Sequence, residues 1–581
     1  MRAAVSGRVG ADRERSFVDS AFRRFFIPSF LSSLGLALGG MVDCLVVGAK
    51  LGPEGLSAIS LGIPVYMFYN LLSYGFSIGG SIHYASALGD GRPEEGVRLF
   101  NNVLRALLGA YLVTAALGLL FLPQLLRLLG ADPAYPGVYA IAERYVRVQL
   151  ICVPVMFCQG PFYYFVHCDD APKRAAAALV TSNIVDIVLN YVFVIRMDMG
   201  AEGSVWSTAV GAVFCLVICM SHIVRREGAL RLRWVPFRLD DLIRSIRTGF
   251  ASAVQYVYQF ATVLAANQLL MSSGGTVGVA VFDVIYNLSQ LTVAVSDGVG
   301  MTLQPMVSTY RAERDRPAVR RTMNLSIRYG TVLSLLVAAA LAAGAEPLCA
   351  FFGLLGADNA LGALALRIYS LGILFTIFNQ CAVYYDQAVG RERRAFLIQT
   401  LRLFLCFLPL CMLLSRMGQD AFWWVFPLSE TGALVYVLAG LRRARRTEGA
   451  AEDKPVYSAY IQEPSALGPE VESLQHTCED WGCSAQQSYY ATLVVEELCA
   501  AILKDAGRNR RPDVLIKLTV VPVDGGMALY LRDNSYQFNP FEMEAEPDGE
   551  VNTLGMSIVK KKAKAFFYRR YLGFNTLVVK L

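Results

Sequence analysis

The sequence repeats one stretch letter for letter: it reads Leu128-Leu129-Gly130-Ala131-Asp132 and, in its second half, Leu354-Leu355-Gly356-Ala357-Asp358. Each copy comes just before the fourth long apolar stretch of its half. Two smaller matches follow the same order at nearly the same offset of about 225 residues, since Tyr145 corresponds to Tyr369, and Gly91-Arg92-Pro93 to Asp315-Arg316-Pro317. Three ordered matches at nearly one offset predict that the chain consists of two similar halves.

The composition indicates that much of the chain is solvated by lipid. Hydrophobic residues make up 55% of the 581 residues, charged residues make up 17%, and the mean hydropathy is +0.43. A soluble protein would carry roughly 25% charged residues. These values exclude an ordinary soluble enzyme, a secreted disulfide scaffold and a disordered protein. Stretches of about 20 apolar residues, long enough to cross a bilayer, are expected at 24–49, 55–85, 98–122, 136–165, 174–195, 203–224, 247–272, 276–304, 324–346, 361–388, 395–415 and 420–441.

The basic residues orient these twelve spans. Alternate connections hold all the arginine and lysine clusters, whereas the other connections hold only the isolated Lys50, Arg127, Arg196 and Arg416. Positive loops stay on the cytoplasmic side of a membrane. The pattern predicts an α-helical polytopic protein of the inner (plasma) membrane with both termini in the cytoplasm. Six plus six helices of the same orientation predict two parallel six-helix lobes.

The chain after residue 446 differs in composition and lacks an apolar stretch long enough to span a bilayer. Helices are predicted over 486–505 and 554–566, and strands over 514–521, 527–532 and 577–581. This pattern indicates a small cytoplasmic α/β sandwich domain. The predicted organisation is a cytoplasmic N-terminal segment (1–20), an N-lobe (21–224), a basic interlobe loop (225–246), a C-lobe (247–446), a linker (447–456) and the α/β domain (457–581).

Acidic residues inside apolar helices are costly and usually functional. Asp43 lies in the first predicted span, and Asp186 lies in the fifth. Asn183, Asp186 and Asn190 are spaced so that they share one helical face. A carboxylate in such surroundings can take up a proton or bind Na⁺ near physiological pH. We therefore expect these four residues to form an ion-coupling site.

Other polar and aromatic residues of the predicted spans are candidates for a substrate path. Tyrosine rings can hold an organic cation by cation–π contact, although interfacial anchoring explains them equally well. Asp297 and Asp386 are expected near helix ends, where a structural role is favoured. No metal site and no catalytic residue are predicted. The substrate-path candidates are Tyr66, Tyr163, Gln255, Asp283, Gln304 and Glu430.

The membrane region, residues 21–441, resembles the multidrug and toxic compound extrusion (MATE) transporters. The likeness rests on Pro28, Asp43, Gly48, Leu51-Gly52, Leu56-Ser57-Ala58, the helix containing Asp186 with Gly200 and Gly203 after it, Gln304-Pro305 at the expected end of helix eight, Arg402 and Pro409. It implies an exporter that exchanges H⁺ or Na⁺ for amphipathic, often cationic, drugs. The family pattern leads us to expect Asn at 186 and Asp at 190, whereas this chain has Asp186 and Asn190. The carboxylate is thereby moved by one helical turn.

The tail, residues 457–581, resembles the histidine-kinase and gyrase type of ATPase, most closely the anti-sigma-factor serine kinases. The resemblance implies a base at Glu497, an adenine contact at Asp533 and a phosphate-binding helix start at Leu554-Gly555-Met556. Ala501 stands where that branch has a Mg²⁺-binding asparagine, and Ser535, Asn552 and Thr553 stand where it has glycines. We therefore expect a degenerate domain in which ATP binding is doubtful and phosphotransfer is lost.

These features together favour a secondary multidrug antiporter, rather than an enzyme, with a regulatory tail. Its expected partners are a small amphipathic or cationic substrate, membrane lipid and a cytoplasmic protein on the tail, but no nucleic acid. H⁺ or Na⁺ is the coupling ion, and no cofactor is required. Two alternatives stay open: a lipid-linked oligosaccharide flippase, favoured by a strongly cationic cavity, and a membrane sensor that signals through the tail, favoured by ATP hydrolysis or phosphorylation of a partner.

Overall fold

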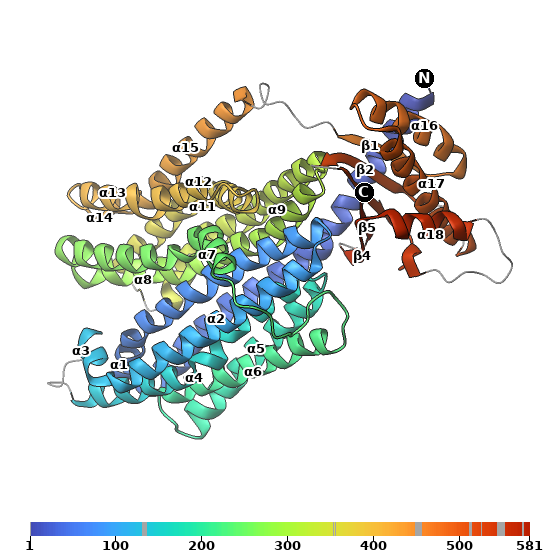
Figure 1. Cartoon of the computed structure of the whole chain (residues 1–581). Helices are drawn as coiled ribbons and strands as arrows, with labels where there is room; N and C mark the ends of the chain where they lie inside the picture. The colour runs from blue at the N-terminus through green and yellow to red at the C-terminus, as the bar shows by residue number, and fades with distance from the viewer. Residues whose placement is uncertain are drawn as a thin grey trace.

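The structure is a computed structural model in which a long helical body carries a small β-sheet unit at one end (Figure 1). We call the end of the body that faces the sheet the sheet-side end. Side chains of some helical residues, Asp43 among them, are outside the described set. The described residues are 2–129, 136–352, 354, 356–447, 456–509, 514–523, 526–542, 552–571 and 574–581.

The first half of the body, which we call the N-lobe, contains six α-helices and one π-helical segment. Proline in the first turn begins α2 and α5, where a missing N–H costs no hydrogen bond. The bounds are α1 Arg2–Gly89, α2 Pro93–Leu120, α3 Leu122–Leu128, α4 Pro136–Cys168, α5 Pro172–Asn190, the π-helical segment η1 Tyr191–Arg196 and α6 Glu202–Val224.

Helix α1 cannot be straight. Arg24 lies 3.5 Å from Asp170, while the Tyr84 hydroxyl donates to the adjacent Asp169 at 2.6 Å. At 1.5 Å of rise per residue, sixty residues of straight helix would separate Arg24 and Tyr84 by about 90 Å. The helical stretch therefore runs away from the sheet-side end and returns to it. It accommodates the first two predicted spans, at 24–49 and 55–85.

The second half of the body, the C-lobe, is built in the same way. Eight helices of the described residues, four in each lobe, are long and apolar enough to cross a membrane, and the other four predicted spans fall within α1, α7 and α8. The bounds are α7 Leu239–Ala253, α8 Gln255–Ala312, α9 Arg316–Ala343, α10 Ala345–Phe351, α11 Ala357–Ala388, α12 Glu392–Thr400, the π-helical segment η2 Leu401–Leu405, α13 Phe407–Leu414, α14 Gln419–Phe422 and α15 Val425–Thr447.

Helix α8 also reverses, because the regions at both of its ends meet Gln387 of α11. Gln387 Oε1 accepts from Ser252 Oγ at 3.1 Å and from Gln304 Nε2 at 2.8 Å. The expectation that Gln304-Pro305 ends a helix is wrong, since α8 contains Pro305 and continues to Ala312. Neighbouring helices can satisfy the backbone that such a proline disturbs.

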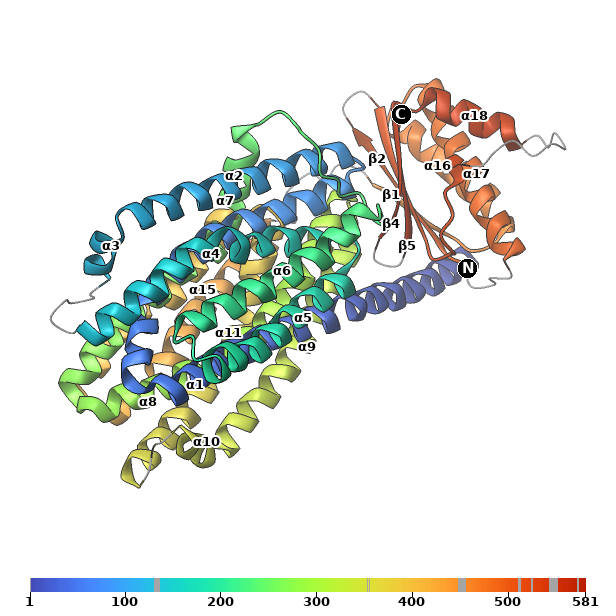
Figure 2. The ribbon, with the colours of Figure 1, turned by 90° about the horizontal axis from the view of Figure 1, so that it is seen from below.

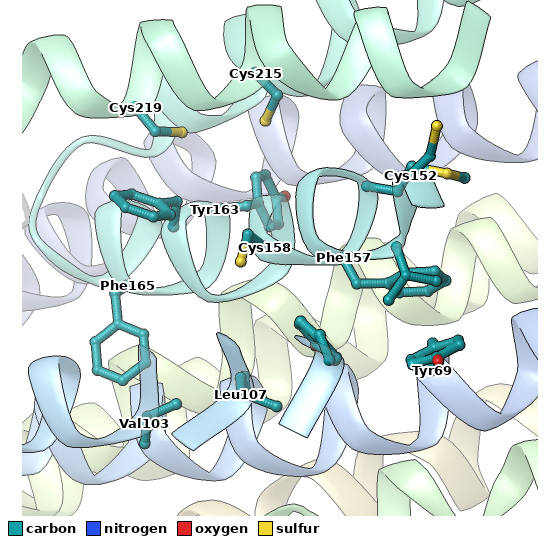
Figure 3. Close-up of a cluster of buried hydrophobic side chains, with 14 of the residues drawn as sticks. Tyr69, Val103, Leu107, Cys152, Phe157, Cys158, Tyr163, Phe165, Cys215 and Cys219 are labelled. Atoms are coloured by element: carbon teal, nitrogen blue, oxygen red, sulfur yellow. The ribbon is translucent and has the colours of Figure 1, made fainter. Parts of the chain in front are cut away.

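Several aromatic side chains pack against one another in the N-lobe core (Figure 3). Phe165 and Phe100 lie 5.0 Å apart between ring centroids, and Tyr69 and Phe157 lie 5.4 Å apart. Tilted and edge-to-face rings pack favourably because their quadrupoles complement each other. Unbonded cysteine thiols fill the gaps between the rings, namely Cys158, Cys215 and Cys219. The core thus joins α1, α2, α4 and α6 into one packed unit.

In the half of the body nearer the sheet, the two lobes approach each other closely at glycine residues. A Cβ added at Gly79 or Gly249 would overlap the backbone carbonyl of Ser245 or Gly75, so α1 and α7 touch backbone to backbone. Nearer the sheet, a Cβ at Gly89 would lie 2.9 Å from the Ala312 side chain. Small residues permit this approach in membrane helices.

The sheet unit has five antiparallel strands in the order β1-β2-β3-β5-β4. Its helices cover the face that points away from the helical body (Figure 2). A capping box of Ser484 and Gln487 begins α17. The bounds are β1 Tyr457–Ile461, α16 Pro464–Asp480, α17 Ala485–Arg508, β2 Ile516–Val523, β3 Gly526–Asp533, the 3₁₀ turn Pro540–Glu542, α18 Asn552–Lys562, β4 Ala565–Tyr571 and β5 Phe574–Lys580.

The predicted helix over 554–566 is wrong at its C-terminal end. Helix α18 ends at Lys562, and β4 begins at Ala565. Phe566, Phe567 and Tyr568 are aromatic residues that favour strands, and Phe567 pairs with Val578 of β5. Strand β1 had no counterpart among the predicted elements. Residues 448–455, which make up most of the predicted linker, lie outside the described residues.

Candidate functional site

Asp186 is a buried carboxylate in the N-lobe that is held only by neutral donors. It lies on α5 and is 9% exposed. It accepts hydrogen bonds from Ser207 Oγ at 2.7 Å and from Thr208 Oγ1 at 3.1 Å, both on α6. Within the described part of the chain, Asp186 has no ion pair with a basic side chain. A charged carboxylate without a cation is expensive in an apolar protein.

The two asparagines predicted with Asp186 lie on the same helix. A Cβ at Gly35 of α1 would come 3.1 Å from Asn183 Nδ2, so Asn183 faces the first helical passage. Asn190 is fully buried and directly precedes the π-helical segment η1. Such segments are frequent at functional sites. The Asp43 side chain lies outside the described residues; its backbone is on α1, one helical turn after Gly39, which also faces Asn183.

Glu430 forms a different kind of site in the C-lobe. Arg402 of η2 donates to it through Nε at 3.0 Å and Nη2 at 2.7 Å. Asn379 Nδ2 adds a third hydrogen bond at 2.7 Å, and Gln399 Oε1 accepts from Arg402 Nη1 at 3.0 Å. All four side chains are buried or nearly so. Glu430 is therefore neutralised within the protein by a two-pronged arginine contact.

The two glutamine candidates form hydrogen bonds between helices of the C-lobe. Gln304 bonds to Gln387, whose Nε2 donates to the Thr248 carbonyl at 3.1 Å. Gln255 accepts from Gln399 at 3.2 Å. The structure therefore gives both candidate glutamines structural partners and brings Gln255 next to the residue that holds Arg402.

One of the two aromatic candidates, Tyr163, lies with other tyrosines where the lobes meet. The Tyr163 hydroxyl donates to Met301 Sδ across the lobe junction at 3.2 Å. On the same helix as Met301, Asp297 accepts from the Tyr384 hydroxyl at 2.7 Å. A second tyrosine pair, Tyr74 and Tyr256, also joins the lobes, with centroids 5.1 Å apart. The expectation that Asp297 lies near a helix end is wrong, because α8 continues to Ala312.

The other acidic and aromatic candidates are placed apart from this group. Tyr66 is 42% exposed and lies against Phe157, with centroids 5.3 Å apart. Asp283 is exposed on α8. Asp386 lies near the end of α11, as expected, and its carboxylate is 3.2 Å from Arg394. None of these three belongs to the Asp186 or Glu430 sites.

The candidate nucleotide-binding residues of the sheet unit contact one another or neighbouring side chains. A Cβ on Gly555 would overlap the Glu497 carboxylate, so the two residues are packed together. Burial raises the pKa of Glu497, and the adjacent Glu496 raises it further. Asp533 is 1% exposed and accepts from Ser535 and from Asn575 Nδ2, the latter at 2.9 Å. Its second oxygen, Oδ2, has no hydrogen-bond partner among the described residues. Burial raises the pKa of Asp533.

Several site residues were missed from the sequence. Ser207 and Thr208 follow Ser204 at helical spacing on α6, a polar stripe in an apolar helix that was itself a detectable signal. Arg402 was noted only as part of the family likeness. Its role with Glu430 could not be found from spacing, since the pair joins two separate helices.

Comparison with known proteins agrees with the fold. The MatE family matches residues 28–192 and 248–413, more than half of the chain. The chain is 22% identical over 326 residues to "Probable multidrug resistance protein YoeA" of Bacillus subtilis, covering 54% of this chain and 70% of that protein. It is 20% identical over 445 residues to "Multidrug export protein MepA" of Staphylococcus saprophyticus, covering 76% and 97%.

Solved structures show the same architecture in the helical body. An "outward-facing conformation of a multidrug resistance MATE family transporter" matches with a TM-score of 0.69 and 20% identity, covering 74% of this chain and 96% of that one. A mutant of the Vibrio cholerae MATE transporter VcmN matches with a TM-score of 0.67 and 18% identity, covering 74% and 98%. From the matched family, which spans both lobes, the chain is a member of the MatE family of membrane transporters.

Proposed function

We propose that the protein is a twelve-span secondary antiporter of the inner membrane that exports amphipathic, often cationic, compounds in exchange for H⁺ or Na⁺. The observation that carries the coupling proposal is Asp186, a buried carboxylate with hydroxyl donors but no basic partner among the described residues. The relatives are named as multidrug resistance and export proteins, which supports the substrate class.

The coupling follows from the cost of an isolated buried charge. With no ion bound, a charged Asp186 favours arrangements that admit water, whereas a protonated or Na⁺-bound Asp186 tolerates a closed N-lobe. An ion shifts a conformational equilibrium only by its difference in affinity for the two states. Movement of α5 against α6 would change the distances from Asp186 to Ser207 and Thr208, and thus provide that difference.

The substrate class is supported by the lobe junction. Asp297 lies among tyrosines contributed by both lobes, including Tyr384 and the Tyr74–Tyr256 pair. A carboxylate beside aromatic faces suits an organic cation, because charge attraction and cation–π contact act together. In this proposal the cation binds between the lobes while one end is open.

The sheet unit is proposed to have the ATPase-like fold without phosphotransfer. Ala501 offers no carbonyl side chain for Mg²⁺, and Glu497 is packed on Gly555 where a nucleotide phosphate would have to approach. Asp533 keeps one oxygen without a hydrogen-bond partner among the described residues, which suits an amino-group donor. We assign the unit a regulatory role rather than an enzymatic one.

The test is efflux of a fluorescent cation from energised inverted vesicles, with H⁺ and Na⁺ gradients imposed separately. We expect gradient-driven transport by the wild type, and loss of that transport in Asp43→Asn and in Asp186→Asn. Glu496→Gln, which removes an exposed carboxylate of the sheet unit, serves as the matched control. Full gradient-driven transport in both membrane variants would refute the N-lobe as the coupling site.

A further inference from the structure

The sheet has two faces, and the face without helices is buried as well. Alternate residues Ile516, Leu518 and Leu529 point into the core formed with α17. Much of the opposite face on β2, β3 and β5 is nevertheless buried, because it lies against the sheet-side end of the helical body (Figure 2). We call this the docking face. Its members are Arg532, whose side chain is 13% exposed, and the buried residues Lys517, Thr519, Val521, Ala528, Tyr530, Arg569, Thr576 and Val578.

The docking face holds the C-lobe by charge. The three-residue loop 313–315 joins α8 to α9 and carries Glu313 and Asp315, which are 3% and 4% exposed. Arg532 is ion-paired with Glu313 and lies 3.2 Å from Asp315, while Lys517 Nζ lies 2.9 Å from Asp315. Two basic residues thus meet two acidic ones in a buried interface, where charge pairs are strongest.

The Arg532 guanidinium also lies over a C-lobe ring. Its Cζ is 4.7 Å from the ring centroid of Tyr310, a residue of α8. A stacked arginine is planar, always charged and held in position by several contacts at once. Beside it, Phe574 of β5 packs in a cluster with Phe22 of α1 and Tyr310. The C-lobe contact is therefore apolar as well as ionic.

The same face holds the N-lobe by packing. Loop 90–92 joins α1 to α2, and a Cβ at Gly91 would lie 3.0 Å from the Val578 side chain. Phe567 packs against the N-lobe core. Burial, with Asp90 close by, raises the pKa of Tyr530 to about 12. Next to this contact, a cavity of about 570 Å³ lies between the N-lobe and the sheet. Its lining includes Asp169 and His222 of the N-lobe and Arg569 and Arg570 of β4.

Loops 90–92 and 313–315 are equivalent positions of the two halves. Each is three residues long, follows the second helical passage of its lobe, and leads into a helix with proline in its first turn. The matching Gly91-Arg92-Pro93 and Asp315-Arg316-Pro317 lie at the junctions of these loops with the helices that follow. One rigid sheet is therefore attached to the corresponding loop of each lobe, directly beyond the Gly89–Ala312 contact between the lobes.

We propose that the sheet unit is an autoinhibitory clamp that ties the two lobes together at the sheet-side end and must release one lobe before that end can open. This inference rests on the proposed alternating-access transport. The lobes rotate apart at one end when the other closes, and a sheet fixed to both loops opposes that rotation. Its contact with the C-lobe is the one that a change of charge can test, since four charged side chains meet there.

The test uses the full chain in lipid nanodiscs and measures amide hydrogen exchange at the lobe junction, in peptides covering 79–89, 245–253 and 303–312. Lys517→Glu/Arg532→Glu places like charges opposite Glu313 and Asp315. We expect at least a severalfold faster exchange in all three peptides and a faster initial rate of cation export. Lys561→Glu/Lys562→Glu, an equal change of charge at two exposed residues of α18, is the control and should leave both unchanged.

A charge exchange makes the result specific. Arg532→Glu alone should accelerate exchange, and Arg532→Glu/Glu313→Arg should restore slow exchange because the ion pair is rebuilt in reverse. Unchanged exchange at the junction in Lys517→Glu/Arg532→Glu would overturn the clamp, as would faster exchange that Glu313→Arg does not reverse. Exchange does not require transport, so a failure of the clamp is distinguishable from a failure of the antiporter proposal.

Discussion

The two lobes each enclose a carboxylate at a candidate site, and they treat it differently. Asp186 in the N-lobe receives hydrogen bonds from two hydroxyls. Glu430 in the C-lobe receives hydrogen bonds from two nitrogens of Arg402 and from Asn379. A carboxylate that is already neutralised by an arginine gains little from a second cation, whereas Asp186, held by hydroxyls, has no basic partner among the residues that the structure describes. Equivalent architecture therefore does not imply equivalent chemistry.

This difference assigns separate duties to the lobes. Breaking a buried ion pair leaves an uncompensated charge, so the C-lobe site is expected to matter for stability. Removing the charge of Asp186 leaves its hydroxyl neighbours with an acceptor if the replacement is asparagine. The N-lobe site is therefore expected to matter for transport more than for folding.

The largest effect is expected from Arg402→Gln. It leaves Glu430 buried without its cation, and loss of one partner of a buried pair costs about 3–5 kcal/mol. We expect a markedly lower melting temperature of the purified protein in detergent. Arg402→Met/Glu430→Leu should recover much of the loss, because no charge is then buried. A melting temperature equal to that of the wild type would show that the pair is not structural.

A second variant exchanges the pair on α5. Asp186→Asn/Asn190→Asp moves the carboxylate by one helical turn, away from Ser207 and Thr208. We expect the affinity for the coupling ion, read from the ion concentration that gives half-maximal transport, to fall by roughly tenfold. This corresponds to about 1.4 kcal/mol. The measurement is transport rate against external Na⁺ and against pH in proteoliposomes. Retention of the wild-type ion dependence would mean that the hydroxyls do not define the site.

A smaller effect is expected from removing the hydroxyls themselves. Ser207→Ala/Thr208→Val deletes both donors, and each neutral hydrogen bond contributes about 1 kcal/mol. We expect the concentration of coupling ion needed for half-maximal transport to change severalfold, with the fold intact. Ser221→Ala is the matched control on the same helix, because its hydroxyl bonds to the Ile218 carbonyl, away from Asp186. The same half-maximal ion concentration in Ser207→Ala/Thr208→Val and in Ser221→Ala would contradict a role of the two hydroxyls in the ion site.

The smallest effect is expected from Asp283→Asn. Asp283 is exposed on α8 and takes no part in either carboxylate site. Asparagine has nearly the shape of aspartate, so the change leaves no cavity and breaks no buried ion pair. We expect both the melting temperature and the ion dependence to match the wild type. A tenfold loss of coupling in this variant would move the ion site into the C-lobe and reverse the comparison.

The sequence predicted the helical body well because apolar length and basic loops act locally. The predicted span 98–122, which falls almost wholly within α2, and the helix holding Asp186 follow directly from such patterns. The reversal of α8 through Gln387 and the strand at Phe567 do not, since they depend on partners distant in the chain. Acidic residues in both lobes could be proposed as candidates from spacing, but only three-dimensional contacts distinguish Asp186 from Glu430.

The docking of the sheet shows the same limit. Lys517 and Arg532 are ordinary basic residues in a strand pattern, and Glu313 and Asp315 lie in a basic loop. Nothing in their local sequence relates them, because the ion pairs join segments about two hundred residues apart. A charged residue on a strand face is usually solvent-exposed. Its burial here is a consequence of tertiary structure alone.

The most direct test of the account compares Asp186→Asn with Glu430→Gln in proteoliposomes, by measuring substrate-cation uptake driven by an imposed H⁺ or Na⁺ gradient. The account predicts that Asp186→Asn stays folded and loses the gradient dependence, whereas Glu430→Gln is less stable and keeps it in the fraction that folds. Gradient-dependent uptake that survives in Asp186→Asn and disappears in folded Glu430→Gln would contradict it.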